Sequence, residues 1–218
     1  MNIKKLLLIF AMCLVAALSF GQRRGGMFRN GMPGQPYSLL NRTDVKTDLA
    51  LTAEQKAKLD GINDDYQPQF REVFQNANGD MAAAMKARQE LSEKEYAEQA
   101  KVLTPDQVTR LGQIGVQLWS YSALLNKDLQ TQVGLSDAQK SKIEDLNKQM
   151  QAANAAIGEK LRNQEINFQD AGPLFQKNSD ALKSSIGDVL TADQKTKLDG
   201  LAGKKFTPDP EPAPGGGG

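Results

Sequence analysis

The amino-acid sequence contains no histidine, and among its 218 residues there is one cysteine, Cys13. Imidazole and thiolate are the usual ligands of zinc and copper and the usual catalytic bases and nucleophiles. If the segment with Cys13 is removed, disulfides, zinc sites and Ser-His-Asp or Cys-His catalysis are excluded. We therefore expect no metal site and no cofactor.

The first 21 residues have the three parts of a secretory signal peptide. Lys4 and Lys5 precede an apolar stretch that runs to Leu18, and the small residues Ser19 and Gly21 have the spacing of a cleavage site. An apolar run this short does not comfortably cross a bilayer, which needs about 20 residues. We expect export to the periplasm or secretion, with a mature chain that begins near residue 22 and has no membrane span.

Charge gives no indication of nucleic-acid binding. The full chain has 27 basic and 26 acidic residues and a net charge of +1. Loss of Lys4 and Lys5 with the signal peptide changes this to −1. A chain with such a balance lacks the basic excess of a nucleic-acid-binding protein.

Both ends of the mature chain have the composition of disordered segments. We expect residues 22–43 to form a flexible basic leader, because this region is rich in Gly, Arg and Pro, and residues 204–218 to form a disordered Pro/Gly-rich tail. The leader is either a solvated segment or a contact for anionic surfaces. The tail is either a spacer or a ligand for a partner.

One short motif occurs four times between these ends. In each copy a leucine is followed by Thr or Ser and, three residues after that, by Gln, which is the pattern of a helix capping box. We therefore interpret the motif as a helix start. Its positions are Leu51, Thr52 and Gln55; Leu103, Thr104 and Gln107; Leu135, Ser136 and Gln139; and Leu190, Thr191 and Gln194.

The four motifs are arranged as two pairs, and the spacing inside the pairs differs by three residues. A duplicated two-motif unit explains this order most simply. We predict two helical units, residues 44–125 and 126–203, packed antiparallel or pseudo-symmetrically so that one chain forms a monomer with pseudo-dimeric halves.

Apolar residues recur at helical spacing after every motif, and strand patterns are absent, so we predict an all-α fold of long amphipathic helices in hairpins. The stripe after the second motif predicts one helix that continues to Leu125. Further helices are expected from Asp80 to Val102 and from Pro173 to Val189. Pro68 should kink or break the first long helix, because it removes a backbone donor and clashes with the preceding turn.

The paired motifs resemble those of the Spy/CpxP family of bacterial periplasmic proteins, which is recognised by its LTxxQ sequence, and the resemblance covers residues 44–202. It implies an all-helical protein built on hairpins. Known members form antiparallel dimers whose concave face holds unfolding proteins without ATP, and others inhibit an envelope stress kinase or bind heavy metals. Four motifs in one chain imply two fused units, and the lack of His disfavours the metal-sensing branch.

The resemblance implies an exported, ATP-independent chaperone-like or envelope stress-response protein whose partners are unfolded or misfolded envelope proteins. Four side chains are candidate client contacts, because Met adapts to varied partners and bases attract acidic chains: Met81, Met85, Lys86 and Arg88. Burial of the methionines in a packed stripe with Ala84 is the competing interpretation.

The alternative function is a non-catalytic structural or regulatory envelope protein that binds a single partner. We do not expect an enzyme. The carboxylate pairs Asp64-Asp65 and Glu93-Glu95 fit the polar faces of predicted helices, and no nucleophile or phosphate-binding motif is present.

Overall fold

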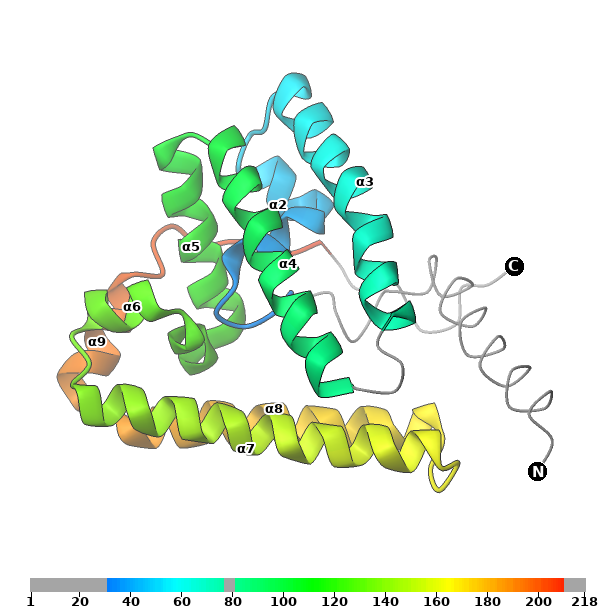
Figure 1. Ribbon diagram of the computed structural model, residues 1–218. Coiled ribbons are helices and arrows are strands. Elements are labelled where there is room, and N and C mark those ends of the chain that lie inside the picture. Colours follow the sequence, from blue (N-terminus) through cyan, green and yellow to red (C-terminus); the bar gives the residue numbers. More distant parts are fainter. Residues whose placement is uncertain (1–30, 77–80, 210–218) are drawn as a thin grey trace.

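A computed structural model describes residues 31–76 and 81–209 (Figure 1). Over this part of the chain all regular elements are helices, and there is no strand. Four long helices form two antiparallel hairpins: the first hairpin is α3 (Ala53–Gln75) with α4 (Met81–Val102), and the second is α7 (Asp137–Arg162) with α8 (Phe168–Val189). The remaining elements form a central hub: the 3₁₀ helices η2 (Pro36–Asn41) and η3 (Ser120–Leu125), and the helices α2 (Thr43–Asp48), α5 (Pro105–Trp119), α6 (Lys127–Val133) and α9 (Ala192–Gly200).

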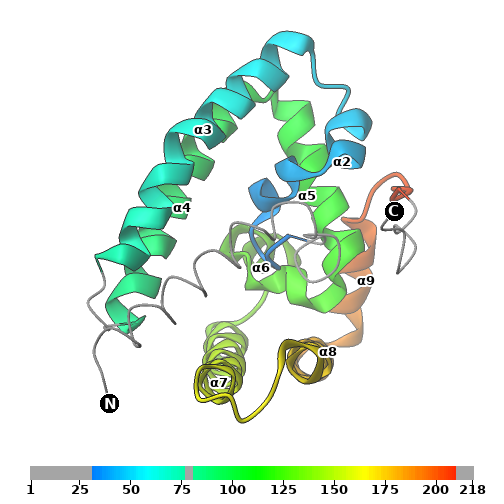
Figure 2. The same ribbon diagram turned by 90° about the vertical axis from the view of Figure 1, so that its right-hand side faces the viewer.

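The two hairpins project from the hub in steeply different directions, and Figure 2 shows the second hairpin end-on while the first runs diagonally away from it. Each hairpin is attached through a 3₁₀ helix, since η2 packs against α4 and α5, and η3 packs against α5, α7 and α8. The fully buried side chains of the hub, which include Leu39, Leu111, Ile114, Leu124 and Ile186, form one core. The two halves therefore share a core, but their hairpins diverge and do not lie antiparallel along each other.

The repeated unit begins earlier than residue 44. Tyr37-Ser38 starts η2 and Tyr121-Ser122 starts η3, and each pair stands at the same distance before its Leu-Thr/Ser motif. Since η3 packs against both helices of the second hairpin, it belongs to the second unit. The expected boundaries at 44 and 126 are thus several residues too late, because the motifs alone did not reveal the shorter Tyr-Ser signal.

The expected flexible leader is wrong for its last part, residues 31–43. Leu39 and Leu40 of η2 are 0% and 1% exposed and lie in the hub core. Gly34 has a left-handed φ of 81°, and a Cβ there would lie 2.6 Å from the Cβ of Leu125. The Gly, Arg and Pro content suggested disorder, but two adjacent leucines bury enough apolar surface to fix this segment. Residues 22–30 lie outside the described part.

The expected disordered tail is also wrong for residues 204–209, which we name the C-terminal strap. Phe206 is 5% exposed and belongs to the hub core, and the Arg42 guanidinium lies 5.7 Å from its ring centroid. Gln117 on α5 holds the backbone on both sides, donating to the Lys204 carbonyl at 2.8 Å and accepting from the Phe206 N–H at 2.7 Å. The strap thus leaves the second unit after α9 and packs on α2 and α5 of the first unit.

Two ion pairs lie beside the strap, of which Arg42–Asp44 is buried and Arg110–Asp48 is half-buried. Arg42 Nε donates to Asp44 at 2.9 Å, and the Asp209 N–H donates to the same carboxylate at 3.0 Å. The pKa of Asp44 is lowered to about 2, and the hydrogen bond from Arg42 is the largest cause of this shift. Arg110 similarly lowers the pKa of Asp48, which it contacts at 2.6 and 3.0 Å. These carboxylates are therefore ionised acceptors at neutral pH and fix α2 to α5 and to the strap.

Three helix boundaries differ from the sequence-based expectation. α3 continues through Pro68, which is solvent-exposed, so the proline does not end the helix. α8 begins at Phe168, before Pro173, because Asn167 caps it by accepting from two backbone N–H groups. α5 ends at Trp119, because Ser120 has a φ of 51°, a conformation that interrupts a helix. Within the described residues, no helix combines the length and the apolar character needed to cross a bilayer.

Candidate functional site

All four motif copies form capping boxes at helix starts, namely those of α3, α5, α7 and α9. In the first copy the Gln55 N–H donates to the Thr52 hydroxyl at 3.1 Å, and the Thr52 N–H donates back to Gln55 Oε1 at 3.1 Å. The other three copies have both bonds between 2.9 and 3.3 Å. The motif residues therefore satisfy backbone donors that a helix start leaves unpaired.

The motif glutamines also bond to each other across each unit, and we call each such pair a glutamine clasp. Gln55 Nε2 donates to Gln107 Oε1 at 2.7 Å, and Gln107 Nε2 donates back at 3.2 Å. Gln139 and Gln194 form the same reciprocal pair at 2.7 and 3.0 Å. Because the partners are 52 and 55 residues apart, each clasp joins the start of a hairpin to the helix that follows it.

Each clasp amide also donates to a backbone carbonyl that lies one or two residues before the leucine of the partner motif. Gln55 donates to Val102 at 2.9 Å and Gln107 to Leu49 at 3.1 Å. Gln139 and Gln194 make the equivalent bonds to Val189 and Gly134. Sequence analysis found the cap but missed this long-range role, although the paired occurrence of the motif was its signal. The clasps close the bases of both hairpins.

The clasp predicts that the motif glutamine contributes more than the motif threonine. Thr52→Ala should lower the free energy of unfolding by about 1 kcal/mol through the lost cap. Gln55→Ala should lower it by about 2–3 kcal/mol, because it removes several hydrogen bonds of about 0.5–1.5 kcal/mol each. Urea titrations of Gln55→Ala, of Gln107→Ala and of the double variant would give the coupling free energy between the two glutamines, which we expect to be about 1 kcal/mol. Equal effects of the Thr52 and Gln55 changes with no coupling would contradict the clasp.

The exposed large apolar side chains of the described region lie near the free ends of the hairpins. Met85 on α4 is 55% exposed, and Phe168 and Leu174 on α8 are 74% and 38% exposed. All three lie in the first two turns of their helices, which are the corresponding helices of the two units. Apolar side chains are therefore exposed near the free end of each hairpin.

The four residues proposed as client contacts have different environments. Met85 and Lys86 are exposed, and Lys86 lies 4.0 Å from Glu90 in a solvent-exposed ion pair. Arg88 is half-buried with its guanidinium 5.9 Å from the Phe70 ring centroid, so it packs within the hairpin. The side chain of Met81 lies outside the described part. Burial in a packed stripe is correct for Ala84, which is 3% exposed, and wrong for Met85.

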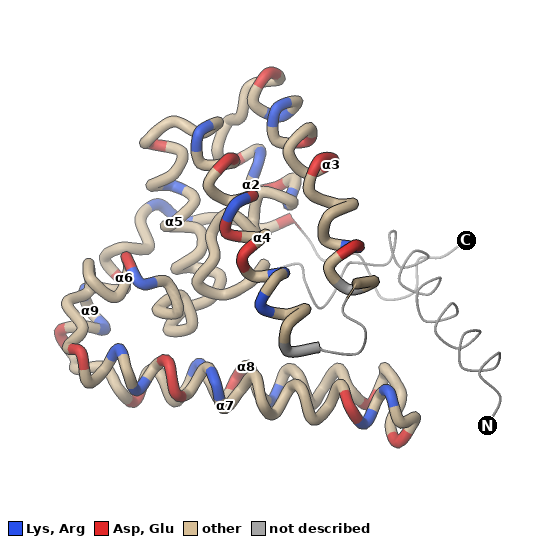
Figure 3. Tube along the Cα trace, viewed as in Figure 1, with Lys and Arg blue, Asp and Glu red and all other residues tan. Residues whose placement is uncertain are grey.

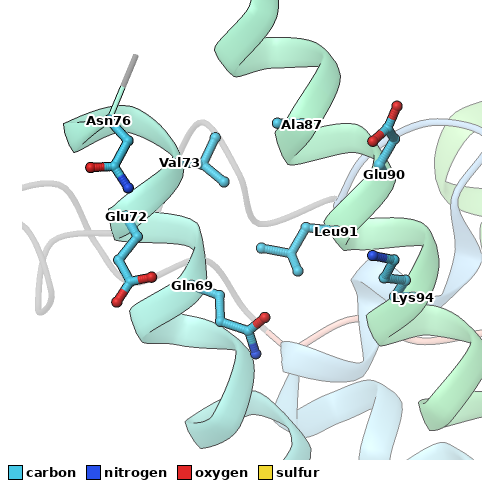
Figure 4. A pocket seen from close by; sticks show the side chains of 8 residues that line it. All are labelled: Gln69, Glu72, Val73, Asn76, Ala87, Glu90, Leu91 and Lys94. Carbon is cyan, nitrogen blue, oxygen red and sulfur yellow. The ribbon is translucent and has the colours of Figure 1, made fainter. Parts of the chain in front are cut away.

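A groove of about 340 Å³ lies between α3 and α4 near the free end of the first hairpin (Figure 4). Val73 and Leu91 point toward each other across it, and Glu72 and Glu90 lie at its edges. At the equivalent positions the second hairpin has Ile157, which is buried, and Asn178, which donates to Asn154 at 2.8 Å. The first hairpin therefore has a groove lined by Val73 and Leu91 where the second has Ile157 and Asn178.

The second hairpin has a charge-free surface that sequence analysis did not select. Residues 149–158 of α7 and 171–176 of α8 contain no Asp, Glu, Lys or Arg, and Figure 3 shows this stretch between charged turns. Four alanines of this stretch are exposed: Ala152, Ala153, Ala155 and Ala156. Phe168 and Leu174 lie on the neighbouring helix. The run of ten uncharged residues in α7 could have indicated this surface from the sequence.

The described residues contain no group of three or more acidic side chains positioned to hold a metal ion. Comparisons of the chain with protein-family models, with curated proteins and with solved structures find no match. The hairpin ends present exposed apolar side chains, a shallow groove and scattered charges of both signs.

Proposed function

We propose that this protein is an exported, ATP-independent chaperone-like or envelope stress-response protein that binds unfolded clients at the ends of its hairpins. The signal-peptide pattern and the resemblance of the paired motifs to the Spy/CpxP family support export and the client class. The observation that carries the proposal is the placement of Met85, Phe168 and Leu174. They leave apolar surface exposed on two-helix hairpins whose ends no other described element covers.

Such a surface suits weak, reversible binding. An exposed phenylalanine or leucine gains apolar contact with any unfolded segment that reaches it, at about 25 cal/mol per Å² of buried apolar area. The alternating charges on the rest of both hairpins keep the surface hydrated and give no preference for one sign of client charge (Figure 3). Binding at two separated ends of one chain would also raise the avidity for a long client.

The test is suppression of aggregation without nucleotide. Reduced α-lactalbumin is mixed with the chain from residue 22 onward, and light scattering is followed. We expect the protein to suppress scattering, and Phe168→Ser with Leu174→Ser to weaken suppression severalfold. Gln169→Ser, an exposed neighbour, is the matched control and should have no effect. Because the changed side chains are exposed, circular dichroism should show unchanged folding.

Met85→Ser tests the first hairpin separately in the same assay. If the chain from residue 22 does not suppress scattering at any ratio, the proposed function is wrong. If it does so equally well with Phe168, Leu174 and Met85 all changed, the client site lies elsewhere.

A further inference from the structure

The buried faces of the two hairpins differ at equivalent positions. α4 and α8 each contain 22 residues and end directly before a Leu-Thr motif, so their residues correspond one to one. Where α8 buries Leu182 and Ile186, at 5% and 0% exposure, α4 buries Glu95 and Gln99, at 9% and 2%. The first hairpin thus has a carboxyl and an amide where its repeat has aliphatic side chains.

This polar pair is incompletely hydrogen-bonded. The Gln99 amide nitrogen donates to Glu95 Oε1 and to Asn63 Oδ1 on α3, both at 3.2 Å. The Gln99 carbonyl oxygen is buried and has no hydrogen-bond partner. A protonated Glu95 carboxyl would have an O–H donor. The Gln99 carbonyl oxygen, which lacks a donor, lies one helical turn away. The neutral carboxyl therefore fits this site better than the carboxylate.

Burial raises the pKa of the Glu95 carboxyl above its ordinary value of 4.5, and Arg88 partly opposes this shift. Arg88 is the one cation among the groups that act on this carboxyl. The other ionisable groups around this face of α4 come from α3, η2 and α4 itself and are Tyr66, Tyr37, Tyr96 and Glu98. Tyr66 donates its hydroxyl to Glu98 at 2.7 Å, so neither of those two supplies a free donor to Glu95.

The two hairpins are also attached to the hub differently. On the second hairpin, Gly187 lets the Tyr121 ring of η3 pack directly on the α8 backbone, beside the buried Ile186. On the first hairpin, the Tyr96 ring stacks on Tyr37 of η2 with centroids 6.0 Å apart. Opening an aliphatic interface to water costs free energy, because apolar surface becomes exposed. A buried carboxylate lowers that cost, because it gains hydration when the interface opens.

We propose that the first hairpin is the more mobile of the two, and that a proton on Glu95 holds α4 against its neighbours α3 and η2, while the packing of the second hairpin does not depend on pH near neutrality. When Glu95 is ionised, the buried carboxylate and the Gln99 carbonyl that lacks a donor both favour hydration, and α4 separates more often from α3 and η2. When Glu95 is protonated, its carboxyl can donate to Gln99, and α4 separates from its neighbours less often. The groove and Met85 would move with this hairpin.

The raised pKa of Glu95 determines how the stability of the first hairpin changes with pH. A carboxyl whose pKa is higher in the folded state destabilises that state at every pH above the folded pKa. The cost disappears as pH falls from the folded pKa toward the unfolded value of 4.5. Docking of the first hairpin should therefore tighten on mild acidification, above the range in which Asp44 takes up a proton and its ion pair is lost.

Hydrogen exchange with mass spectrometry tests the proposal without any client, so its outcome is independent of the proposed function. Protection factors of α4 should fall severalfold between pH 5 and pH 7.5, and those of α8 should stay constant. Glu95→Gln, which keeps the size and supplies a permanent donor, should abolish the change in α4, and so should Glu95→Leu, which copies α8. Glu93→Gln, an exposed neighbour, is the matched control and should retain it.

Two results would overturn the proposal. One is α4 protection that does not depend on pH, or that depends on it equally in Glu95→Gln. The other comes from carbon NMR of the unmodified chain, which needs no variant to fold: Glu95 must titrate above the ordinary glutamate value of 4.5, and titration at or below that value would exclude the proton-dependent packing of α4.

Discussion

Phe206→Ala is expected to lower the free energy of unfolding by about 3–5 kcal/mol, as measured by urea titration at neutral pH. Removing a buried phenylalanine costs its transfer free energy and leaves a cavity. Phe206 is 5% exposed in the hub core and lies beneath the Arg42 guanidinium. The neighbouring residue Lys205 is exposed, so Lys205→Ala should change stability by less than about 0.5 kcal/mol.

Shortening the chain tests the same strap by another route. A chain that ends after residue 209 keeps the contacts of Phe206 and Asp209 and should unfold like the full chain. A chain that ends after residue 203 loses both, together with the carbonyl of Lys204 that Gln117 and Arg110 bind. Equal stability of the two shortened chains, or an unchanged midpoint for Phe206→Ala, would show that the strap does not hold the units together.

Gly187→Ala is expected to lower stability by about 2 kcal/mol or more, although alanine favours helix. A Cβ at this position would lie 2.6 Å from Cδ2 and 2.7 Å from Cε2 of the Tyr121 ring. The Tyr121 ring of η3 is partly buried against the core, so relief requires the ring or α8 to shift, and overpacking of this kind costs about 1–3 kcal/mol. Thermal unfolding followed by circular dichroism would measure the loss.

Gly112→Ala in α5 is the matched control, because a Cβ there meets nothing within 4 Å. It should raise stability by about 0.5–1 kcal/mol through helix propensity. In a Tyr121→Ala background the obstacle is gone, and Gly187→Ala should no longer be harmful. If Gly187→Ala stabilised the protein as Gly112→Ala does, the second hairpin would not pack on η3 as described.

Much of the local structure could be predicted because it depends on short-range chemistry. A Thr or Ser followed three residues later by Gln satisfies backbone donors within one turn, so the starts of α3, α5, α7 and α9 follow from their own residues. The helical periodicity of apolar residues similarly identified the long helices. Errors occurred where a boundary depends on partners elsewhere in the chain, as in the strap and in the Leu39-Leu40 segment.

In the candidate site, too, residue type could be predicted from the sequence, whereas exposure depended on distant parts of the chain. Composition identified Met85 as a possible contact, but a methionine at helical spacing can equally be buried, and only the open end of the first hairpin leaves it exposed. Phe168 was not selected, because its exposure depends on the early start of α8 at the Asn167 cap. Exposure is a property of the packed molecule, so residue type cannot fix it.

By itself, the sequence determined that this protein is all-helical, that its helices begin at four capping boxes and that its unit is duplicated, since each follows from residues within a few turns of one another. Only the tertiary structure decided that the motif glutamines form clasps, that residues 204–209 return from the second unit to pack on the first, and that the two hairpins diverge. It also decided that Glu95 and Gln99 are buried where the repeat has Leu182 and Ile186. These features join residues that are tens of positions apart, and their energies depend on burial and geometry that no local pattern contains.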